Sequence, residues 1–321
     1  MSMGPGVARS YGEDMLSQTL NRASRSVRAR RAVESLPITR NVVNRFVAGE
    51  TTSDAVDASV GLLARGRSIT IDVLGEDVTD LAGARATRDG YLALLAALGE
   101  AGCAAGADVS VKLSAVGQAL ASGEEVATAH AREICAAAGA VGATVTLDME
   151  DHTTTDSTLA IGTLLRAEHP WVGNVLQSNL LRTPGDITDL AGAGVRIRLV
   201  KGAYREPSGV ALPRKADVDH AYGRAIDALM TSPCYPMIAT HDQEMLARAV
   251  ARAAEAGREA GDWETQMLYG VRTDLQQQTV DAGLQMRVYL PFGTDWYGYF
   301  MRRLAERPAN VAFFVRALAH R

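Results

Sequence analysis

Residues 143–177, ATVTLDMEDHTTTDSTLAIGTLLRAEHPWVGNVLQ, contain the pattern that decides the fold. The runs Ala143–Met149 and Val172–Gln177 are short and rich in Val, Leu and Thr, which is typical of β-strands. Between them, Ser157–Glu168 has apolar residues at three- and four-residue spacing, which predicts an amphipathic helix. This order of strand, helix and strand indicates parallel strands joined by a helix.

The same alternation continues on both sides of this stretch and predicts eight strands in total. The other candidate strands are Ile69–Leu74, Val109–Ser114, Val195–Lys201, Pro236–Thr240, Thr265–Tyr269 and Gln285–Leu290. The other helical patterns are Arg85–Ala101, Glu124–Ala140, Val218–Met230 and Gln243–Ala256. Eight repeats of strand and helix over roughly 250 residues predict a closed (β/α)8 TIM-type barrel, in which burial of both strand faces accounts for continuous apolar runs.

An open, doubly wound sheet is the competing architecture. No strand is followed by GxGxxG, because the pair Gly192 and Gly194 precedes a strand, and no P-loop occurs. We therefore predict an α/β protein whose barrel, residues 67–321, carries the functional sites. Residues 1–66 are predicted to add N-terminal helices packed on the barrel, because about 65 residues would form a marginal core alone.

Two helical patterns are expected within this N-terminal segment. One is Asn41–Ala48, and the other is Ser53–Leu63. Ser53 is followed by Asp54 and Asp57 before an apolar periodicity, which indicates a helix N-terminus.

The composition limits the partners and the compartment. The chain has 321 residues, 47% of them hydrophobic, and its net charge of −4 predicts no nucleic-acid partner. The three cysteines, Cys103, Cys135 and Cys234, lack a metal-site spacing with histidine and indicate a reducing, cytoplasmic compartment. No apolar stretch approaches the ~20 residues that span a bilayer.

Polar residues stand at the carboxyl ends of the predicted strands, where chemistry is located in barrels of this type. They are Lys112, Asp148, Glu150, Gln177, Arg198, Lys201, His241 and Tyr289. An unpaired buried charge costs several kcal/mol, so these side chains must neutralise one another or a ligand. Arg302 and Arg303 follow the last strand, and two guanidinium groups over the mouth would bind a carboxylate. We therefore expect a small acid as ligand.

Two other chemistries remain open at this point. A desolvated Lys112 or Lys201 could form a Schiff base with a carbonyl substrate, as in an aldolase. A metal-dependent hydrolase would use His241, Asp148, Glu150 and His152 as ligands. The metal hypothesis is weak because only one histidine stands at a strand end and no HxH pair occurs. A serine hydrolase is disfavoured because no GxSxG motif is present.

Several blocks of sequence resemble the proline dehydrogenase family of flavin enzymes. The long blocks are RLVKGAYRE at 198–206, RVYLPFG at 287–293 and RRLAE at 302–306. Shorter blocks follow the family's order at Asp72–Glu76, Val111–Ser114, Leu147–Glu150, Leu176–Gln177, Ala239–His241 and Glu264–Gly270. The resemblance covers about residues 69–310. It is closest to the monofunctional bacterial form, since the sequence stops where bifunctional members continue into an aldehyde dehydrogenase.

The resemblance implies FAD bound at the barrel mouth without a Rossmann domain. Cofactor contacts are then expected from Met149, Gln177, Arg198, Lys201, Gly202, Ala203, Thr240 and His241. Arg198 would lie near the flavin N5 atom, and Asp148 would orient the neighbouring cations. The substrate would be held by Lys112, Arg302 and Arg303 at its carboxylate, by Tyr289 at its ring, and by a gate formed by Glu76 and Arg303.

The implied reaction is hydride transfer from L-proline to flavin N5, which gives 1-pyrroline-5-carboxylate and begins proline catabolism. Hydroxyproline is the alternative substrate. The electrons would pass to a quinone-type acceptor, so we expect at most a peripheral contact with the inner face of the membrane. No polybasic amphipathic helix accompanies this expectation. Arg205 stands where many members, chiefly bifunctional ones, carry an aromatic residue. Its side chain would neighbour the cofactor; the alternative is that it points outward and pairs with Glu206.

Overall fold

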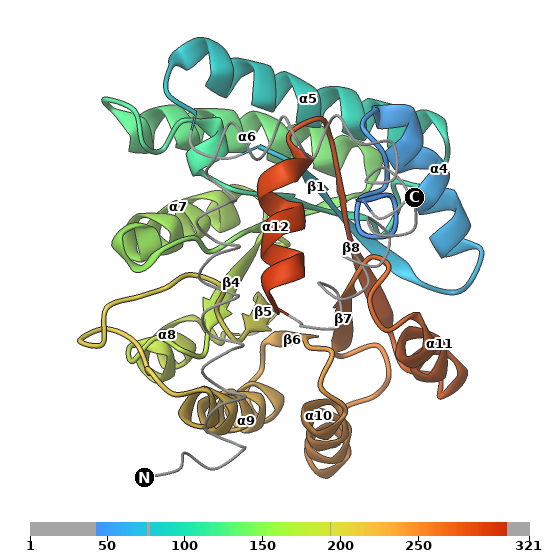
Figure 1. The fold of residues 1–321 in the computed structure, drawn as a ribbon, viewed down its shortest axis with the longest axis vertical. Helices are drawn as coiled ribbons and strands as arrows, with labels where there is room; N and C mark the ends of the chain where they lie inside the picture. Colours follow the sequence, from blue (N-terminus) through green and yellow to red (C-terminus); the bar gives the residue numbers. More distant parts are fainter. Residues whose placement is uncertain (1–42, 76–77, 193, 307–321) are drawn as a thin grey trace, which may run out of the picture.

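A computed structural model describes residues 43–75, 78–192 and 194–306. Within these ranges, eight parallel strands close into a barrel in chain order (Figure 1). The strands are β1 (Ser68–Val73), β2 (Asp108–Val111), β3 (Thr144–Leu147), β4 (Gly173–Gln177), β5 (Arg196–Val200), β6 (Tyr235–Ala239), β7 (Glu264–Leu268) and β8 (Met286–Phe292). The predicted closed barrel is confirmed, and the open doubly wound sheet is wrong.

Helices surround the barrel and connect its strands (Figure 1). They are α4 (Thr52–Leu63), α5 (Leu81–Glu100), α6 (Gly123–Val141), α7 (Thr155–Glu168), α8 (Thr183–Leu190), α9 (Lys215–Thr231), α10 (Gln243–Glu255), α11 (Thr273–Asp281) and α12 (Trp296–Glu306). Two 3-10 turns, η1 (Ser114–Val116) and η2 (His152–Thr154), follow β2 and β3. Across the described part of the chain, no helix combines the length and the apolar character needed to cross a membrane.

The first described helix, α4, begins earlier than the sequence predicts. Its N-cap is Thr51, whose hydroxyl accepts a hydrogen bond from the Asp54 backbone N–H, while the Asp54 carboxylate accepts one from the Thr51 N–H at 2.9 Å. This reciprocal pair is a capping box, and it places the boundary before Ser53. Of the predicted stretch Asn41–Ala48, residues 41 and 42 lie outside the described residues, and residues 44–46 form a turn.

The two faces of each strand differ in polarity. On β2, Val109 and Val111 pack outward in one core with residues of α5 and α6, while on β5 Ile197 and Leu199 pack against α9. The alternate residues point into the barrel, where Arg198 reaches across from β5 to Asp108 on β2. The expectation of continuous apolar strands is therefore wrong for the inner face, because the charges there pair with one another.

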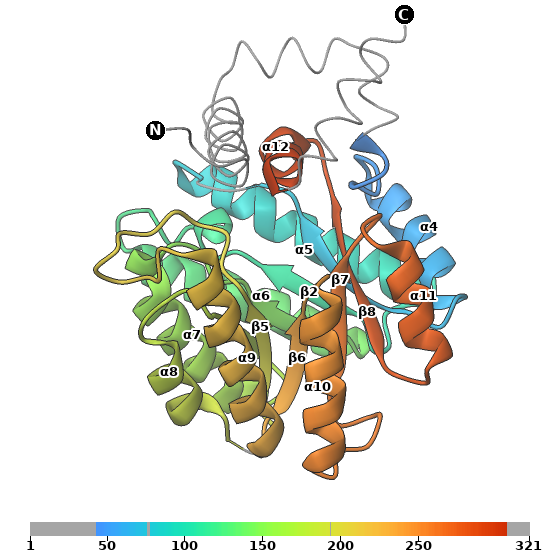
Figure 2. The same cartoon turned by 60° about the horizontal axis from the view of Figure 1, so that its bottom comes forward.

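Helix α12 lies across one end of the barrel (Figure 2). Its apolar residues form a core with the segment before α4, including an aromatic contact of 6.5 Å between the rings of Phe46 and Phe300. The indole N–H of Trp296 also donates to Glu50 Oε1 at 3.1 Å. These contacts hold α12 in place as a cover over the strand ends.

Candidate active site

A cavity of about 620 Å³ lies at the carboxyl ends of the strands, between the barrel and α12. The predicted site residues that line it are Lys112, Asp148, Met149, Gln177, Arg198, Lys201, Gly202, Ala203, Thr240, His241, Tyr289, Arg302 and Arg303. Glu76 falls outside the described residues. The structure thus brings together every residue it describes for which the resemblance implies a cofactor or substrate contact, and their roles remain predictions. Glu150 and His152, the other candidate metal ligands, do not line this cavity.

Asp148 joins two of the cavity's largest side chains. Arg198 Nη1 on β5 donates to Asp148 Oδ1 at 2.8 Å, and the Tyr289 hydroxyl on β8 donates to Oδ2 at 2.7 Å. The Arg198 guanidinium also lies 5.4 Å from the centre of the Tyr289 ring, within range of a cation–π contact. One carboxylate therefore orients both a cation and an aromatic ring at the mouth.

The ionisation of this cluster follows from its burial and its charges. Burial raises the pKa of Asp148, but the nearby charges of Arg198 and Lys112 outweigh that effect, so the pKa lies below its usual value. Burial and the charge of Asp148 raise the pKa of Tyr289 well above its usual value. At neutral pH Asp148 is an anion and Tyr289 a protonated phenol, which makes Asp148 a weak base.

Lys112 is held by a neighbour that the sequence analysis did not single out. Its ammonium donates to both carboxylate oxygens of Asp72, at 2.7 and 2.9 Å, and both side chains are almost fully buried. Asp72 lies on β1, next to β2, and also lines the cavity. The available signal was the alternation of polar Ser68, Thr70 and Asp72 with apolar residues along β1.

Lys201 is paired with two carboxylates that sequence reasoning also missed. Its ammonium donates to Asp219 Oδ1 at 2.6 Å and to Asp242 Oδ2 at 3.2 Å, and it lies 5.7 Å from the centre of the Tyr222 ring. Burial lowers the pKa of Lys201, but the hydrogen bonds to Asp219 and Asp242 outweigh it and the net shift is upward. Lys201 is therefore a cation.

The backbone after β5 approaches its neighbours closely at Gly202. This glycine has φ of +105°, and a Cβ atom there would lie 2.1 Å from Asn179 Oδ1. Both the backbone conformation and the available space require glycine. The next residue, Ala203, also lines the cavity. At these two positions the cavity is therefore bordered by main chain rather than by bulky side chains.

Three further predicted cofactor contacts are anchored to the main chain. Gln177 donates from Nε2 to the Glu150 carbonyl at 2.8 Å, and His241 Nε2 accepts from the backbone N–H of Leu268 at 2.9 Å. This bond requires that Nε2 of His241 carries no proton. The third, Thr240, accepts a hydrogen bond at its hydroxyl from a neighbouring backbone N–H at 3.1 Å.

The arginines of α12 complete the cavity. Arg302 and Arg303 both line it, and the Arg303 guanidinium lies 5.1 Å from the centre of the Tyr299 ring. Tyr299 stands one helical turn before Arg303, so the helix spacing alone could have identified it as a neighbour.

The metal hypothesis finds no support in the donor geometry. Within the described ranges, no group of three His, Cys, Asp or Glu could hold a metal ion. Glu150 instead accepts hydrogen bonds from the backbone and hydroxyl of Ser114, and His152 pairs with Glu206 through both its backbone N–H and its ring. The alternative in which Arg205 pairs with Glu206 finds no support in the described residues, where the ion pair of Glu206 is with His152 in the loop after β3.

The comparisons of this chain with known proteins agree on one family. The sequence model of the family described as proline dehydrogenase matches residues 56–316. The proline dehydrogenase of Deinococcus radiodurans is 42% identical over 315 residues, covering 95% of this chain and 99% of that protein. Proline dehydrogenase 1 of Bacillus subtilis is 38% identical over 280 residues, covering 87% of this chain and 91% of that protein.

A solved structure shares the fold. Proline utilization A (PutA) from Bdellovibrio bacteriovorus, inactivated by N-propargylglycine, superposes with a TM-score of 0.77 at 24% identity. The match covers 84% of this chain but 33% of that protein, so this chain corresponds to one part of a larger molecule there.

Proposed function

The chain belongs to the proline dehydrogenase family, and on this basis we propose that it oxidises L-proline to 1-pyrroline-5-carboxylate with FAD as the hydride acceptor. The observation that carries the proposal is the cluster of Asp148, Arg198 and Tyr289 at the barrel mouth, next to the arginines of α12. It combines an aromatic surface with fixed positive charge in one cavity. A small cyclic amino acid and a flavin both require these features.

The cavity residues fit a flavin. Gly202 and Ala203 allow a planar ring system to approach the main chain. Gln177, Lys201 and the other predicted cofactor contacts line the same cavity. We propose that these residues hold FAD.

The substrate side of the proposal rests on charge. Lys112, Arg302 and Arg303 would bind the proline carboxylate, each charged hydrogen bond contributing about 1.5–3 kcal/mol. Tyr289 would pack against the pyrrolidine ring, in an orientation that its bond to Asp148 maintains. These contacts would leave the carbon next to the nitrogen facing the cofactor.

When bound, FAD supplies the oxidant, since flavin N5 accepts a hydride. Proline loses two electrons with the hydride from carbon and one proton from nitrogen, and the C=N bond forms. The amine must be neutral before the transfer. Because the pKa of Asp148 is low, we propose that water accepts this proton and that Asp148 serves to orient Arg198 and Tyr289.

An absorption spectrum and an anaerobic titration with proline test the proposal. We expect a yellow protein whose flavin bands bleach as proline is added, with 1-pyrroline-5-carboxylate as product. A Schiff-base enzyme would be colourless and would be trapped by borohydride with a carbonyl substrate. The structure gives that alternative little support, because Lys112 and Lys201 are both ion-paired and a protonated lysine is not a nucleophile. A colourless protein that proline does not affect would overturn the proposal.

We further propose a quinone-type compound as electron acceptor. Quinones reside in the bilayer, so this acceptor would require a peripheral contact with the membrane surface. Steady-state oxidation of proline should then be faster with a soluble quinone analogue than with oxygen alone. Equal rates with both acceptors would argue against it.

A further inference from the structure

Asp108 lies directly beneath the active-site cavity, inside the barrel. Its carboxylate is fully buried and accepts hydrogen bonds from the hydroxyls of Thr70, Thr144 and Thr146 at 2.7 to 3.0 Å. It also accepts one from Arg198 Nη2 at 3.1 Å.

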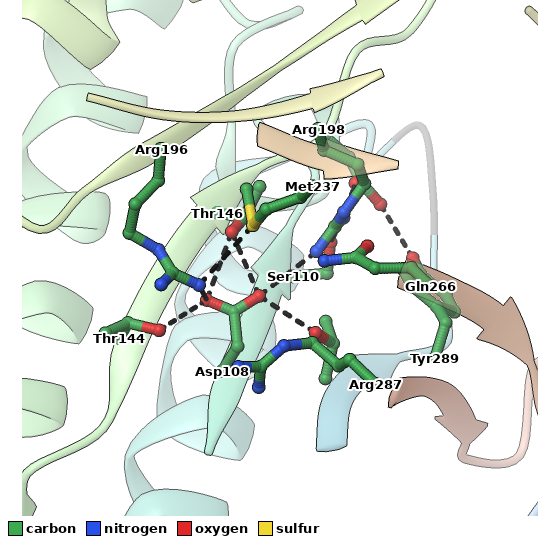
Figure 3. A network of polar contacts seen from close by, with 12 residues as sticks. Asp108, Ser110, Thr144, Thr146, Arg196, Arg198, Met237, Gln266, Arg287 and Tyr289 are labelled. Carbon is green, nitrogen blue, oxygen red and sulfur yellow. Dashed lines mark hydrogen bonds and ion pairs between the residues drawn. The ribbon is translucent and has the colours of Figure 1, made fainter. Parts of the chain in front are cut away.

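The Arg198 guanidinium is consequently held between two carboxylates. Asp148 binds Nη1 from the cavity side, with 15% of its side chain exposed, whereas Asp108 binds Nη2 from the interior and is 0% exposed. Ser110 adds a hydrogen bond to Nη1 at 2.9 Å. Figure 3 shows the side chains of Arg196 and Arg198 directed from β5 toward Asp108.

The charges of this interior are balanced. The arginines are Arg196, Arg198 and Arg287, and the carboxylates are Asp108, Asp148 and Glu264. Arg196 lies 4.0 Å from Asp108, while Arg287 binds Glu264 directly at 2.6 Å. Removing the charge of Asp108 would therefore leave one positive charge in excess, in a region of low dielectric next to the cavity.

We propose that Asp108 is a positioning residue for Arg198: it fixes the guanidinium from inside the barrel and reduces the positive charge that Arg198 presents to a flavin in the cavity. The proposal rests on the function proposed above. Reduction by hydride adds negative charge to the flavin, so a stronger positive field favours the reduced form. Asp108 accordingly keeps the flavin's reduction potential lower than Arg198 alone would set it.

The decisive measurement is the midpoint potential of the FAD-loaded Asp108→Asn variant, followed by its absorption spectrum during electrochemical reduction. An asparagine keeps an oxygen for Arg198, and the surrounding threonine hydroxyls can donate or accept, so the side chain can be accommodated. We expect the potential to rise by about 30 mV or more, which is a tenfold change in the equilibrium constant for two electrons. An unchanged or lower potential would overturn the proposal.

Two control variants separate the loss of the Asp108 charge from two other effects: a less firmly held Arg198 guanidinium, and the loss of any buried negative charge. Ser110→Ala removes a hydrogen bond from the same guanidinium without changing charge, so its potential should stay near that of the wild type. Glu264→Gln removes an equally buried negative charge whose partner is Arg287 rather than Arg198. Its potential should shift by less than half as much. An equal shift in either variant would contradict a specific role for Asp108.

If Asp108→Asn does not fold, Arg196→Gln tests the same charge balance with the opposite sign, because it removes the positive charge 4.0 Å from Asp108 and leaves more of the carboxylate's negative charge uncompensated. Its potential should fall, and an unchanged or higher potential would contradict the proposal. Failure of the proposed function would be seen separately, in the wild-type protein rather than in these variants. In that case wild-type protein would bind no flavin, or proline would not reduce it.

Discussion

The hydrogen bond from Tyr289 on β8 to Asp148, directly after β3, crosses the mouth of the barrel between strands that are not neighbours, with 2.7 Å between the oxygens. Because Asp148 also binds Arg198, the phenol ring is fixed relative to the guanidinium. Tyr289 is therefore held at both its face and its hydroxyl, which makes it a defined wall of the cavity rather than a mobile side chain.

Replacing Tyr289 should change the preference between substrates. Tyr289→Ser removes the ring and should narrow the preference for proline over 4-hydroxyproline by about tenfold or more, in line with the ~1–3 kcal/mol that a small group contributes in a pocket. Tyr289→Phe is the matched control, because it keeps the ring and loses only the bond to Asp148. Its preference should remain that of the wild type. The measurement is kcat/KM for both substrates, together with Tm. An unaltered ratio with a lower Tm in Tyr289→Ser would assign the ring to stability alone.

The arginines of α12 are predicted to bind the substrate carboxylate. Arg302→Met should raise KM for proline by one to two orders of magnitude, as expected for the loss of a charged hydrogen bond of about 1.5–3 kcal/mol. Flavin content should be unchanged. Arg132→Met on α6, which removes a surface pair with Glu168, should leave KM unaffected. Normal proline binding in Arg302→Met, or loss of its flavin, would contradict the assignment.

Gly202 should tolerate no side chain. In Gly202→Ala, the new Cβ would collide with Asn179 and the backbone would keep a φ of +105°, so the loop after β5 should be destabilised by more than about 1 kcal/mol. Because this loop lines the cavity, the flavin-to-protein absorbance ratio should fall. Gly209→Ala in the same loop has open space around it and should behave as wild type. Equal flavin content in the two variants would show that the close approach at Gly202 is unimportant.

Glu264 predicts a specific dependence of stability on pH. Burial raises its pKa, but Arg287 outweighs this and the net pKa is about 2, against an ordinary value of 4.5. A lowered pKa contributes stability above pH 4.5 that is lost as the pH falls toward 2. The difference in unfolding free energy between wild type and Glu264→Gln should therefore shrink by up to roughly 3 kcal/mol over this range. Denaturant unfolding at pH 7, 4 and 3 measures it, and a difference independent of pH would refute the linkage.

The barrel and most of its site residues could be predicted because their signals are local. A strand shows its apolar run, and the polar residue after it, such as Asp148 after β3 or Lys201 after β5, stands at the mouth by topology alone. Asp219 could not be predicted, because its contact with Lys201 depends on how α9 is rotated against β5. That rotation is set by packing between distant segments rather than by spacing within either one.

Asp108 was missed for a different reason. Its strand reads Asp-Val-Ser-Val-Lys over 108–112, so polar residues alternate with valines, and the same period occurs in Arg196-Ile-Arg-Leu. An interpretation of these runs as uniformly apolar points only to the residues at their carboxyl ends. A period of two in strands buried on both faces indicates a polar barrel interior, and it would have identified Asp108 and Arg287.

The closure of the barrel has a consequence for synthesis of the chain. Strand β1 pairs with β8 along its whole length, and Arg287 Nη1 donates at 2.7 Å to the Ile69 carbonyl, 218 positions earlier. A ribosome releases β1 long before β8, so its edge stays unpaired while the intervening residues are translated. Tyr289 emerges with β8 itself, and the arginines of α12 follow it. A nascent chain therefore lacks the complete cavity until its eighth strand is available, and a ligand of this cavity can bind only at the end of folding.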